Sequence, residues 1–158
     1  RELVENQRGI TYFGLFGPYL AGAKKIVVED AYVRKPYQLR NLAEFLEMLL
    51  RCKNPDEDIA VHLVTGHNEP GFVEAQLNGL NELASTFSQL GVNLTYEFRD
   101  TLHDRSITAD TGWEILLGRG LDIFQKFVDG DWLNPLLRHQ QLRRVKECKI
   151  TYRRIDEK

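Results

Sequence analysis

The sequence has few cysteines and no long apolar run, and each shortage excludes a class of protein. Cys52 and Cys148 lie far apart and lack the spacing of metal ligands. We expect both to be reduced thiols, as in a cytoplasmic protein. No apolar stretch approaches the roughly 20 residues that a membrane-spanning helix requires. Residues 1–5 also lack the basic and then apolar pattern of a signal peptide.

The charge composition excludes a protein that coats nucleic acid through bulk electrostatics. The formal net charge is −2, with 21 basic and 23 acidic residues. A local basic patch remains open, because net charge does not describe distribution. The 158 residues fit one domain, so we predict a single domain over 1–158. The first residue is not Met, from which we expect a fragment of a longer protein.

Hydrophobic periodicity predicts alternating helices and strands in the first two thirds of the chain. Uninterrupted or alternating apolar residues predict strands, and apolar residues at helical spacing predict helices. The helices are expected over 12–21, 36–51 and 71–90, and the strands over 25–32, 59–65 and 92–98. This order implies right-handed crossovers between parallel strands. We therefore predict an α/β fold with a mostly parallel central sheet flanked by helices.

The pattern changes after Arg99, where shorter elements are expected. Strands over 105–108 and 113–117 flank a turn at 109–112 that contains Asp and Gly, which predicts a hairpin. A short helix is expected over 121–127 and a loop over 129–131. Alternation over 144–153 predicts a final strand.

His103, Arg105 and Asp110 form the most informative pattern in the sequence. On a strand, residues i and i+2 share a face, so His103 and Arg105 could address one anion while Asp110 reaches back from the turn. A guanidinium offers a fork of donors matched to phosphate and stays charged. The pattern therefore predicts an anion site. The structural alternative is that His103 and Asp104 hydrogen-bond across the sheet and hold the hairpin.

The spacing of these residues resembles the HxKxxxxD signature of the phospholipase D superfamily. The resemblance implies that His103 corresponds to the phosphoryl-accepting nucleophile and Asp110 to a residue that supports local structure. Arg105 stands where the superfamily has a phosphate-holding Lys, and the Ser and Asn that follow the motif are missing. Active members need two copies of the motif at one site. The single copy here would need a homodimer to complete the pair.

Three further blocks narrow the resemblance. They are Gly112-Trp113, the stretch GRGLDIF over 118–124, and VEDAYVR over 28–34, in which Ala31 stands where Pro is usual. With the motif they are similar to the phospholipase-D-like domain found at the C-terminus of MIT-domain-containing proteins, over about residues 9–127. The resemblance implies a dimeric, catalytically degenerate domain that in animal members binds membrane lipid head groups. Asp110 is retained here, although the degenerate animal version need not have it.

Glycines and cations elsewhere could extend the anion site. Gly118 and Gly120 let backbone amides approach a ligand, and the N-terminus of the helix expected after them attracts anions. Arg119 would add a charge-assisted contact. The alternative is a plain strand-to-helix turn. Arg34 and Lys35 follow the first parallel strand, at the edge where open α/β sheets tend to place ligands.

For the remaining polar residues, a structural role is favoured over a role in binding a ligand or metal. Glu29 and Asp30 lack a third ligand for a metal, so we expect carboxylates that bond loop amides or pair with Arg34. Three histidines stand alone in the sequence and are expected to pack or to lie at the surface: His62, His67 and His139. A basic cluster is expected to be a solvated face or a membrane contact: Arg138, Arg143, Arg144 and Lys146.

These observations favour one function and leave two open. The first is a non-catalytic, dimeric module that binds phosphate-bearing ligands, above all anionic phospholipid head groups, with no cofactor or metal. The second is a phosphodiesterase or nuclease that uses His103 across a homodimer. The third is a protein-interaction scaffold. A cytoplasmic location, peripheral at membranes, is expected; nucleic acid is a less favoured ligand, and protein partners of any missing domains stay open.

Overall fold

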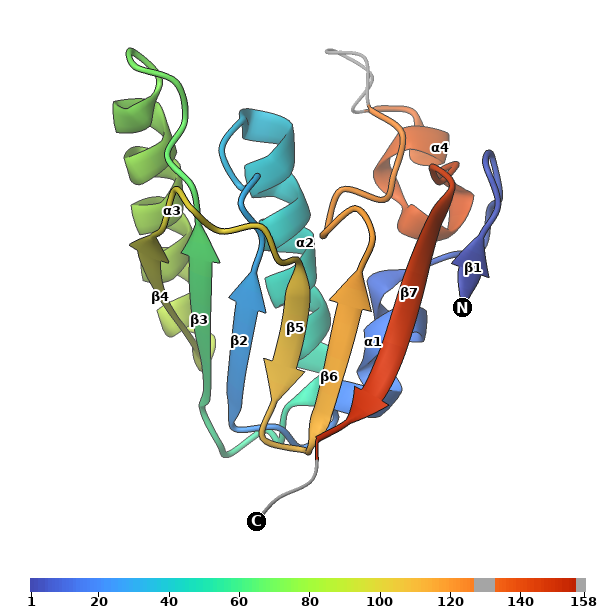
Figure 1. The fold of residues 1–158 in the computed structure, drawn as a ribbon. Coiled ribbons are helices and arrows are strands. Elements are labelled where there is room, and N and C mark those ends of the chain that lie inside the picture. The colour runs from blue at the N-terminus through green and yellow to red at the C-terminus, as the bar shows by residue number, and fades with distance from the viewer. Residues whose placement is uncertain (127–132, 156–158) are drawn as a thin grey trace.

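The fold is built on a seven-stranded sheet (Figure 1). The computed structural model describes residues 1–126 and 133–155. The order of the strands across the sheet is β1-β7-β6-β5-β2-β3-β4. Their bounds are β1 Glu2–Leu3, β2 Lys25–Glu29, β3 Ile59–Thr65, β4 Val92–Phe98, β5 Ser106–Ala109, β6 Trp113–Leu117 and β7 Cys148–Arg154.

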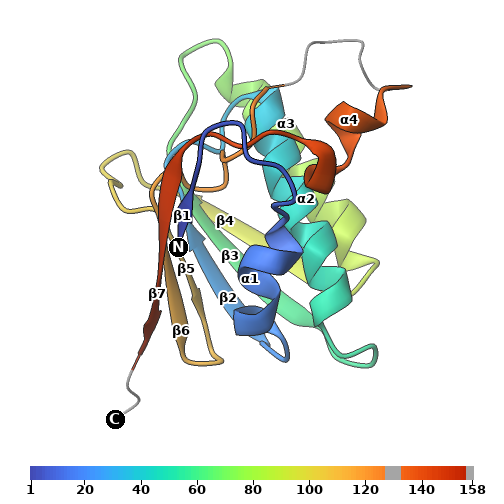
Figure 2. The same cartoon turned by 90° about the vertical axis from the view of Figure 1, so that its right-hand side faces the viewer.

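Helices cover one face of this sheet (Figure 2). They are α1 (Tyr12–Leu20), α2 (Pro36–Cys52) and α3 (Val73–Ser88), followed later by the short α4 (Pro135–Arg138) and the 3-10 turn η2 (Gln140–Leu142). The core lies between sheet and helices, where Tyr12, Phe16 and Phe45 are fully buried and their rings pack together. No helix in the described part of the chain is both long and apolar enough to cross a membrane.

The expectation of a mostly parallel sheet is wrong: the sheet is mixed and mostly antiparallel. Within the described residues, β2–β3 and β3–β4 are the parallel pairs, as the alternation of strands and helices predicted. The pairs β2–β5, β5–β6, β6–β7 and β1–β7 are antiparallel. A tight turn reverses the chain between β5 and β6, which forces antiparallel pairing. The periodicity did not reveal that this hairpin docks on β2, with Ile107 opposite Val28.

Some boundaries also differ from those expected. The described part of the helix expected over 121–127 is a turn and an isolated bridge between Phe124 and Val145. The final strand begins at Cys148 rather than at residue 144, because Val145 hydrogen-bonds instead to Asn6 and Gln7 near the N-terminus. The first parallel strand ends at Glu29, and the hairpin strand spans 106–109 rather than 105–108. The loop expected at 129–131 lies outside the described residues.

The hairpin turn between β5 and β6 is confirmed. Gly112 has φ of +94°, a conformation that suits glycine, and its amide donates to the Ala109 carbonyl at 3.1 Å. The start of α2 is fixed in a comparable way. Pro36 occupies the first turn, and the Gln38 side-chain oxygen accepts from the amides of Arg34 and Lys35 at 3.1 and 3.0 Å. This cap holds the loop after β2 against the helix that follows it.

Candidate anion-binding site

One edge of the sheet collects most of the cations that the sequence singled out. The carboxyl ends of β2, β3, β4 and β6 lie at this edge together with the amino end of β5 (Figure 1). Arg34 and Lys35 follow β2, His103 and Arg105 precede β5, and Arg119 follows β6. We call this the ligand edge; the term means the rim formed by these strand ends and the loops that follow or precede them, not an outermost strand of the sheet. Ligands of open α/β sheets tend to bind at the carboxyl ends of parallel strands.

Two guanidinium groups flank one tyrosine at the ligand edge. The Arg34 guanidinium lies 4.9 Å from the centre of the Tyr32 ring, and that of Arg105 lies 5.0 Å from it. Arg34 Nε donates to the Ala31 carbonyl at 2.8 Å, and Arg105 Nη1 donates to the Gly118 carbonyl at 3.2 Å. Cation–π contacts of this kind contribute roughly 0.5–1 kcal/mol at exposed sites. Backbone carbonyls and an aromatic ring therefore orient both cations and leave their charge in place.

His103 lies in the loop before β5, not on the strand, so the expectation that it shares a strand face with Arg105 is wrong. The side chain is exposed, and no described residue hydrogen-bonds to it or pairs with it. Leu102 anchors this loop by packing in a small buried cluster with Ala31 and Val64. The imidazole is thus presented to solvent beside a fixed backbone.

Asp110 lies at the opposite edge of the sheet, so the expectation that it reaches back to His103 and Arg105 is wrong. Its Oδ1 accepts from the Lys24 amide at 3.0 Å, and its own amide donates to the Lys25 carbonyl at 3.1 Å. The four residues of β5 separate it from Arg105, which places the two Cα atoms about 16 Å apart. The carboxylate therefore ties the turn after β5 to the start of β2.

The glycines after β6 serve close backbone packing. The Gly118 amide donates to the Lys149 carbonyl at 3.0 Å, and the Gly120 amide donates to the Leu117 carbonyl at 3.4 Å. In the described residues after them the expected helix does not form, so it supplies no dipole for an anion. Arg119 is exposed, and its Nε donates to the Glu147 carbonyl at 2.8 Å. The other N–H groups of this guanidinium are not used in that bond.

Asp30 is a buried carboxylate directly beneath the ligand edge. Its Oδ1 accepts from the Tyr32 amide and its Oδ2 from the Leu121 amide, each at 3.0 Å. Burial raises the pKa of Asp30, while these two hydrogen bonds and the charge of Arg105 oppose the rise. The expectation that a carboxylate here bonds loop amides is confirmed. Glu29, by contrast, is only partly buried at the end of β2.

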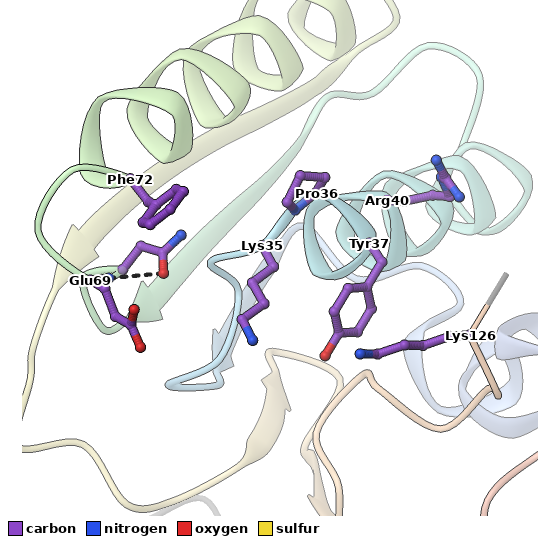
Figure 3. Close-up of a pocket in the computed structure, with 8 residues that line it drawn as sticks. Lys35, Pro36, Tyr37, Arg40, Glu69, Phe72 and Lys126 are labelled. Atoms are coloured by element: carbon purple, nitrogen blue, oxygen red, sulfur yellow. Dashed lines mark hydrogen bonds between the residues drawn. The ribbon is translucent and has the colours of Figure 1, made fainter. Parts of the chain in front are cut away.

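A cavity of about 630 Å³ opens beside the ligand edge (Figure 3). Its walls come from the start of α2, the loop after β3, and Lys126. The lining residues are Lys35, Pro36, Tyr37, Arg40, Asn68, Glu69, Phe72 and Lys126. The Lys126 ammonium lies 4.6 Å from the centre of the Tyr37 ring.

The sequence predicted only Lys35 among these lining residues. Arg40 could have been assigned to this site from the sequence, since it follows Pro36 by four residues and so lies on the same helical face. Lys126 could not have been assigned to it, because only the tertiary fold brings this residue to α2.

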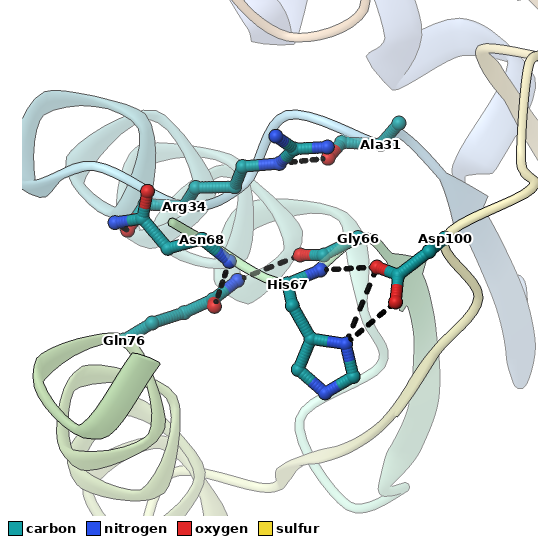
Figure 4. A network of polar contacts seen from close by, with 7 residues as sticks. All are labelled: Ala31, Arg34, Gly66, His67, Asn68, Gln76 and Asp100. Atoms are coloured by element: carbon teal, nitrogen blue, oxygen red, sulfur yellow. Dashed lines mark hydrogen bonds and ion pairs between the residues drawn. The ribbon is translucent and has the colours of Figure 1, made fainter. Parts of the chain in front are cut away.

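A polar network holds the loop after β3 against the loop after β2 (Figure 4). Gln76 is almost fully buried, and its Nε2 donates to the carbonyls of Val33 and Gly66 at 3.0 and 2.9 Å. Its Oε1 accepts from the Asn68 amide at 2.8 Å. Because all of these partners are backbone groups, one side chain fixes the distance between two walls of the cavity.

Two histidines that stand alone in the sequence are paired in space. His67 meets the Asp100 carboxylate at 2.9 Å, and His62 meets Glu97 at 2.9 Å (Figure 4 shows the first pair). The hydrogen bonds from the His67 backbone and side chain lower the pKa of Asp100, and the bond to His62 lowers that of Glu97. Within the described residues, no group of three His, Cys, Asp or Glu side chains is placed to hold a metal ion.

The basic cluster near the C-terminus does not form one cationic surface. Arg143 is buried, with its Nη1 3.0 Å from the Glu44 carboxylate and its guanidinium over the Phe124 ring. Lys146 pairs with Asp122 at 3.0 Å. Arg143 therefore ties η2 to α2 and is removed from the surface. Arg144 is exposed, as is His139, which the sequence predicted to lie at the surface or in packing.

Residues 9–154 match the model of the phospholipase D-like domain at the C-terminus of MIT. The chain belongs to this family. It is also 36% identical over 126 residues to mouse MIT domain-containing protein 1, an alignment that covers 79% of this chain and 50% of the relative. The chain thus spans about half the length of that curated relative.

The family assignment confirms the resemblance inferred from the motif blocks. It also extends the resemblance over a longer part of the chain. The matched range includes the ligand edge, the cavity and β7. It runs further toward the C-terminus than the residues 9–127 expected from the sequence.

Proposed function

We propose that this domain binds phosphate-bearing ligands without hydrolysing them, and that the ligands are anionic phospholipid head groups at a membrane surface. Arg105, Arg119 and Arg34 would make the principal contacts, with His103 and Lys35 supporting them. As in the resemblance, the binding form would be a homodimer.

The observation that carries this proposal is the gathering of cations at the ligand edge in a chain whose net charge is −2. Arg34, Arg105 and Arg119 come from three separate segments and are exposed or partly exposed. Each is oriented by a backbone carbonyl rather than by a carboxylate. A cation held in this way keeps its charge for an external anion, and each one near an anionic membrane contributes about 1 kcal/mol.

The enzymatic alternative gains less support from the geometry. A phosphodiesterase would use His103 of two chains, one as nucleophile and one as acid. Asp110 contacts the start of β2 instead of the His103 loop. Trapping of a phosphohistidine on His103 would support this alternative. A scaffold that binds only protein would bind neither vesicles nor phosphate esters.

Co-sedimentation with vesicles tests the proposal. We expect binding to vesicles that contain an acidic lipid and none to neutral vesicles, with the bound fraction falling as salt rises, because exposed charges are screened. A parallel titration with a short DNA duplex compares the less favoured ligand. Equal binding to acidic and neutral vesicles, or binding to the duplex alone, would contradict the membrane proposal.

A further inference from the structure

We propose that the cavity beside the ligand edge is a binding site for a phosphate monoester. The cavity is the one lined by Lys35, Arg40 and Lys126, and it is separate from the contacts of Arg105 and Arg119. The inference rests on the proposed function in one respect, since it names the class of head group. A soluble phosphate ester would present the same chemistry, and parallel binding to vesicles and to soluble esters separates the two sources.

The charge of the cavity favours a phosphate with two negative charges. Among the residues that the structure describes, three cations and one carboxylate, that of Glu69, line it. They are joined by the positive end of the dipole of α2, a helix of 17 residues. A phosphate monoester carries a charge of about −1.5 to −2 at neutral pH. A phosphodiester carries a single charge and would be attracted less strongly by the ammonium groups of Lys35 and Lys126.

The cations reach the cavity from separate segments. Figure 3 shows Lys35 between two groups of lining residues, with Tyr37 and Lys126 on one side and Glu69 and Phe72 on the other. The Lys126 ammonium is placed against the face of the Tyr37 ring. Lys35 lies at the end of the loop whose amides are capped by Gln38. A phosphate in the cavity would therefore be approached by ammonium groups from two separate segments of the chain.

The walls of the cavity are held at a fixed separation. Gln76 joins the backbone of Val33 to that of Gly66 and Asn68 with three hydrogen bonds of 2.8–3.0 Å. The polar atoms of Gln76 are thus used within the wall and are not needed by a ligand. A site whose supporting residues are fixed loses little conformational entropy when a ligand binds.

The apolar part of the lining fits the remainder of a head group. Pro36, Tyr37 and Phe72 supply this part, and a cavity that combines apolar walls with a few charged groups is typical of small-molecule sites. Phe72 is 58% exposed at the mouth, directly after Gly71 with φ of +94°. An exposed aromatic residue beside cations suits the interface between a bilayer and water.

Vesicle binding with matched lipids tests this site in the whole chain. The probes are vesicles with phosphatidic acid, a monoester, and vesicles with phosphatidylglycerol, a diester, adjusted to equal zeta potential. The variants are Lys35→Gln and Lys126→Gln, and the control is Lys25→Gln, an exposed lysine at the opposite end of β2. Glycerol 3-phosphate and dimethyl phosphate are titrated by calorimetry as the soluble monoester and diester.

The proposal predicts a loss of about tenfold or more in affinity for the monoester in each cavity variant, since each removes a charge-assisted contact. Binding to the diester vesicles should change several-fold less, and Lys25→Gln should match the wild type. If the source is a lipid, Phe72→Ser should weaken vesicle binding several-fold more than it weakens glycerol 3-phosphate binding. Binding of glycerol 3-phosphate at the cavity without any vesicle binding would support the site for a soluble ester and contradict the membrane proposal.

Two results would overturn the site. One is an equal loss on both vesicle types, which would indicate general electrostatic attraction. The other is unchanged binding in both cavity variants. If Arg105→Ala still weakened vesicle binding about fivefold in that case, the proposed function would stand and only the cavity site would fail.

Discussion

The carboxylate of Asp30 packs directly against Gly120, a contact that joins the loop after β2 to the turn after β6. A Cβ added at Gly120 would overlap this carboxylate, with the Asp30 Cγ only 2.6 Å away. The adjacent Leu121 amide donates to Asp30 Oδ2 at 3.0 Å. Gly120 also has φ of +62°. The GRGLD block therefore has a structural basis: it closes the ligand edge around a buried carboxylate.

Gly120→Ala should lower the free energy of unfolding by more than about 3 kcal/mol, because it combines a left-handed backbone with a displaced Asp30. Gly112→Ala is the matched control. Gly112 also has a positive φ, but the atoms nearest to a Cβ there belong to the flexible Arg154 side chain, the closest at 3.4 Å, so the substitution should cost about 1 kcal/mol. Urea unfolding measures both variants, and equal losses would contradict the packing explanation.

Asp30→Asn should reduce stability most at acid pH. Burial raises the pKa of Asp30 in the folded state above the ordinary aspartate value of 3.8. Between the unfolded and the folded pKa, the native state holds more protons, so the contribution of Asp30 to stability is largest below 3.8 and falls as pH rises through the folded pKa.

The Asn variant loses one of the two amide acceptors, at a cost of about 1–3 kcal/mol. It does not titrate, so the difference in unfolding free energy between wild type and variant should shrink as pH rises from about 3.8 toward neutrality. Urea unfolding across this range checks the trend. A difference that grows with pH would show that the ionised carboxylate, rather than the protonated one, is favoured by the fold.

Asp110→Ala should leave ligand binding unchanged and reduce stability slightly. The variant removes an exposed hydrogen bond to the Lys24 amide, which contributes about 0.5–1.5 kcal/mol. Vesicle co-sedimentation and urea unfolding measure the two effects separately. Loss of binding in a variant that remains folded would place Asp110 in the ligand site, against its position at the opposite edge of the sheet.

Much of the fold could be predicted from the sequence because local patterns determine it. The apolar spacing from Pro36 onward located α2, and the Asp-Gly turn before Trp113 located the hairpin. The mostly antiparallel pairing of the strands could not be predicted, because the docking of β5 on β2 depends on long-range packing around Ile107. The start of the final strand was shifted because backbone groups bond elsewhere, as at Val145.

The candidate site was predicted only in part, because local spacing in the sequence identifies some of its residues and the tertiary fold alone brings the others together. Arg105 and Arg119 were found through motif spacing, and the structure places both at one edge. Spacing alone suggested that Asp110 would join them, but the four residues of β5 carry it to the opposite edge. The cavity was missed because its cations, Arg40 and Lys126, are distant in sequence and meet only when α2 packs beside the loop after β6.

The central claim is that the cations of the ligand edge bind anionic lipid. One vesicle experiment tests this claim directly. Co-sedimentation with acidic vesicles should be about fivefold weaker for Arg105→Ala and for Arg119→Ala, from the loss of about 1 kcal/mol per cation, and unchanged for Lys25→Ala. Circular dichroism confirms that the variants are folded. Wild-type affinity in both arginine variants, or an equal loss in the Lys25 control, would contradict the account.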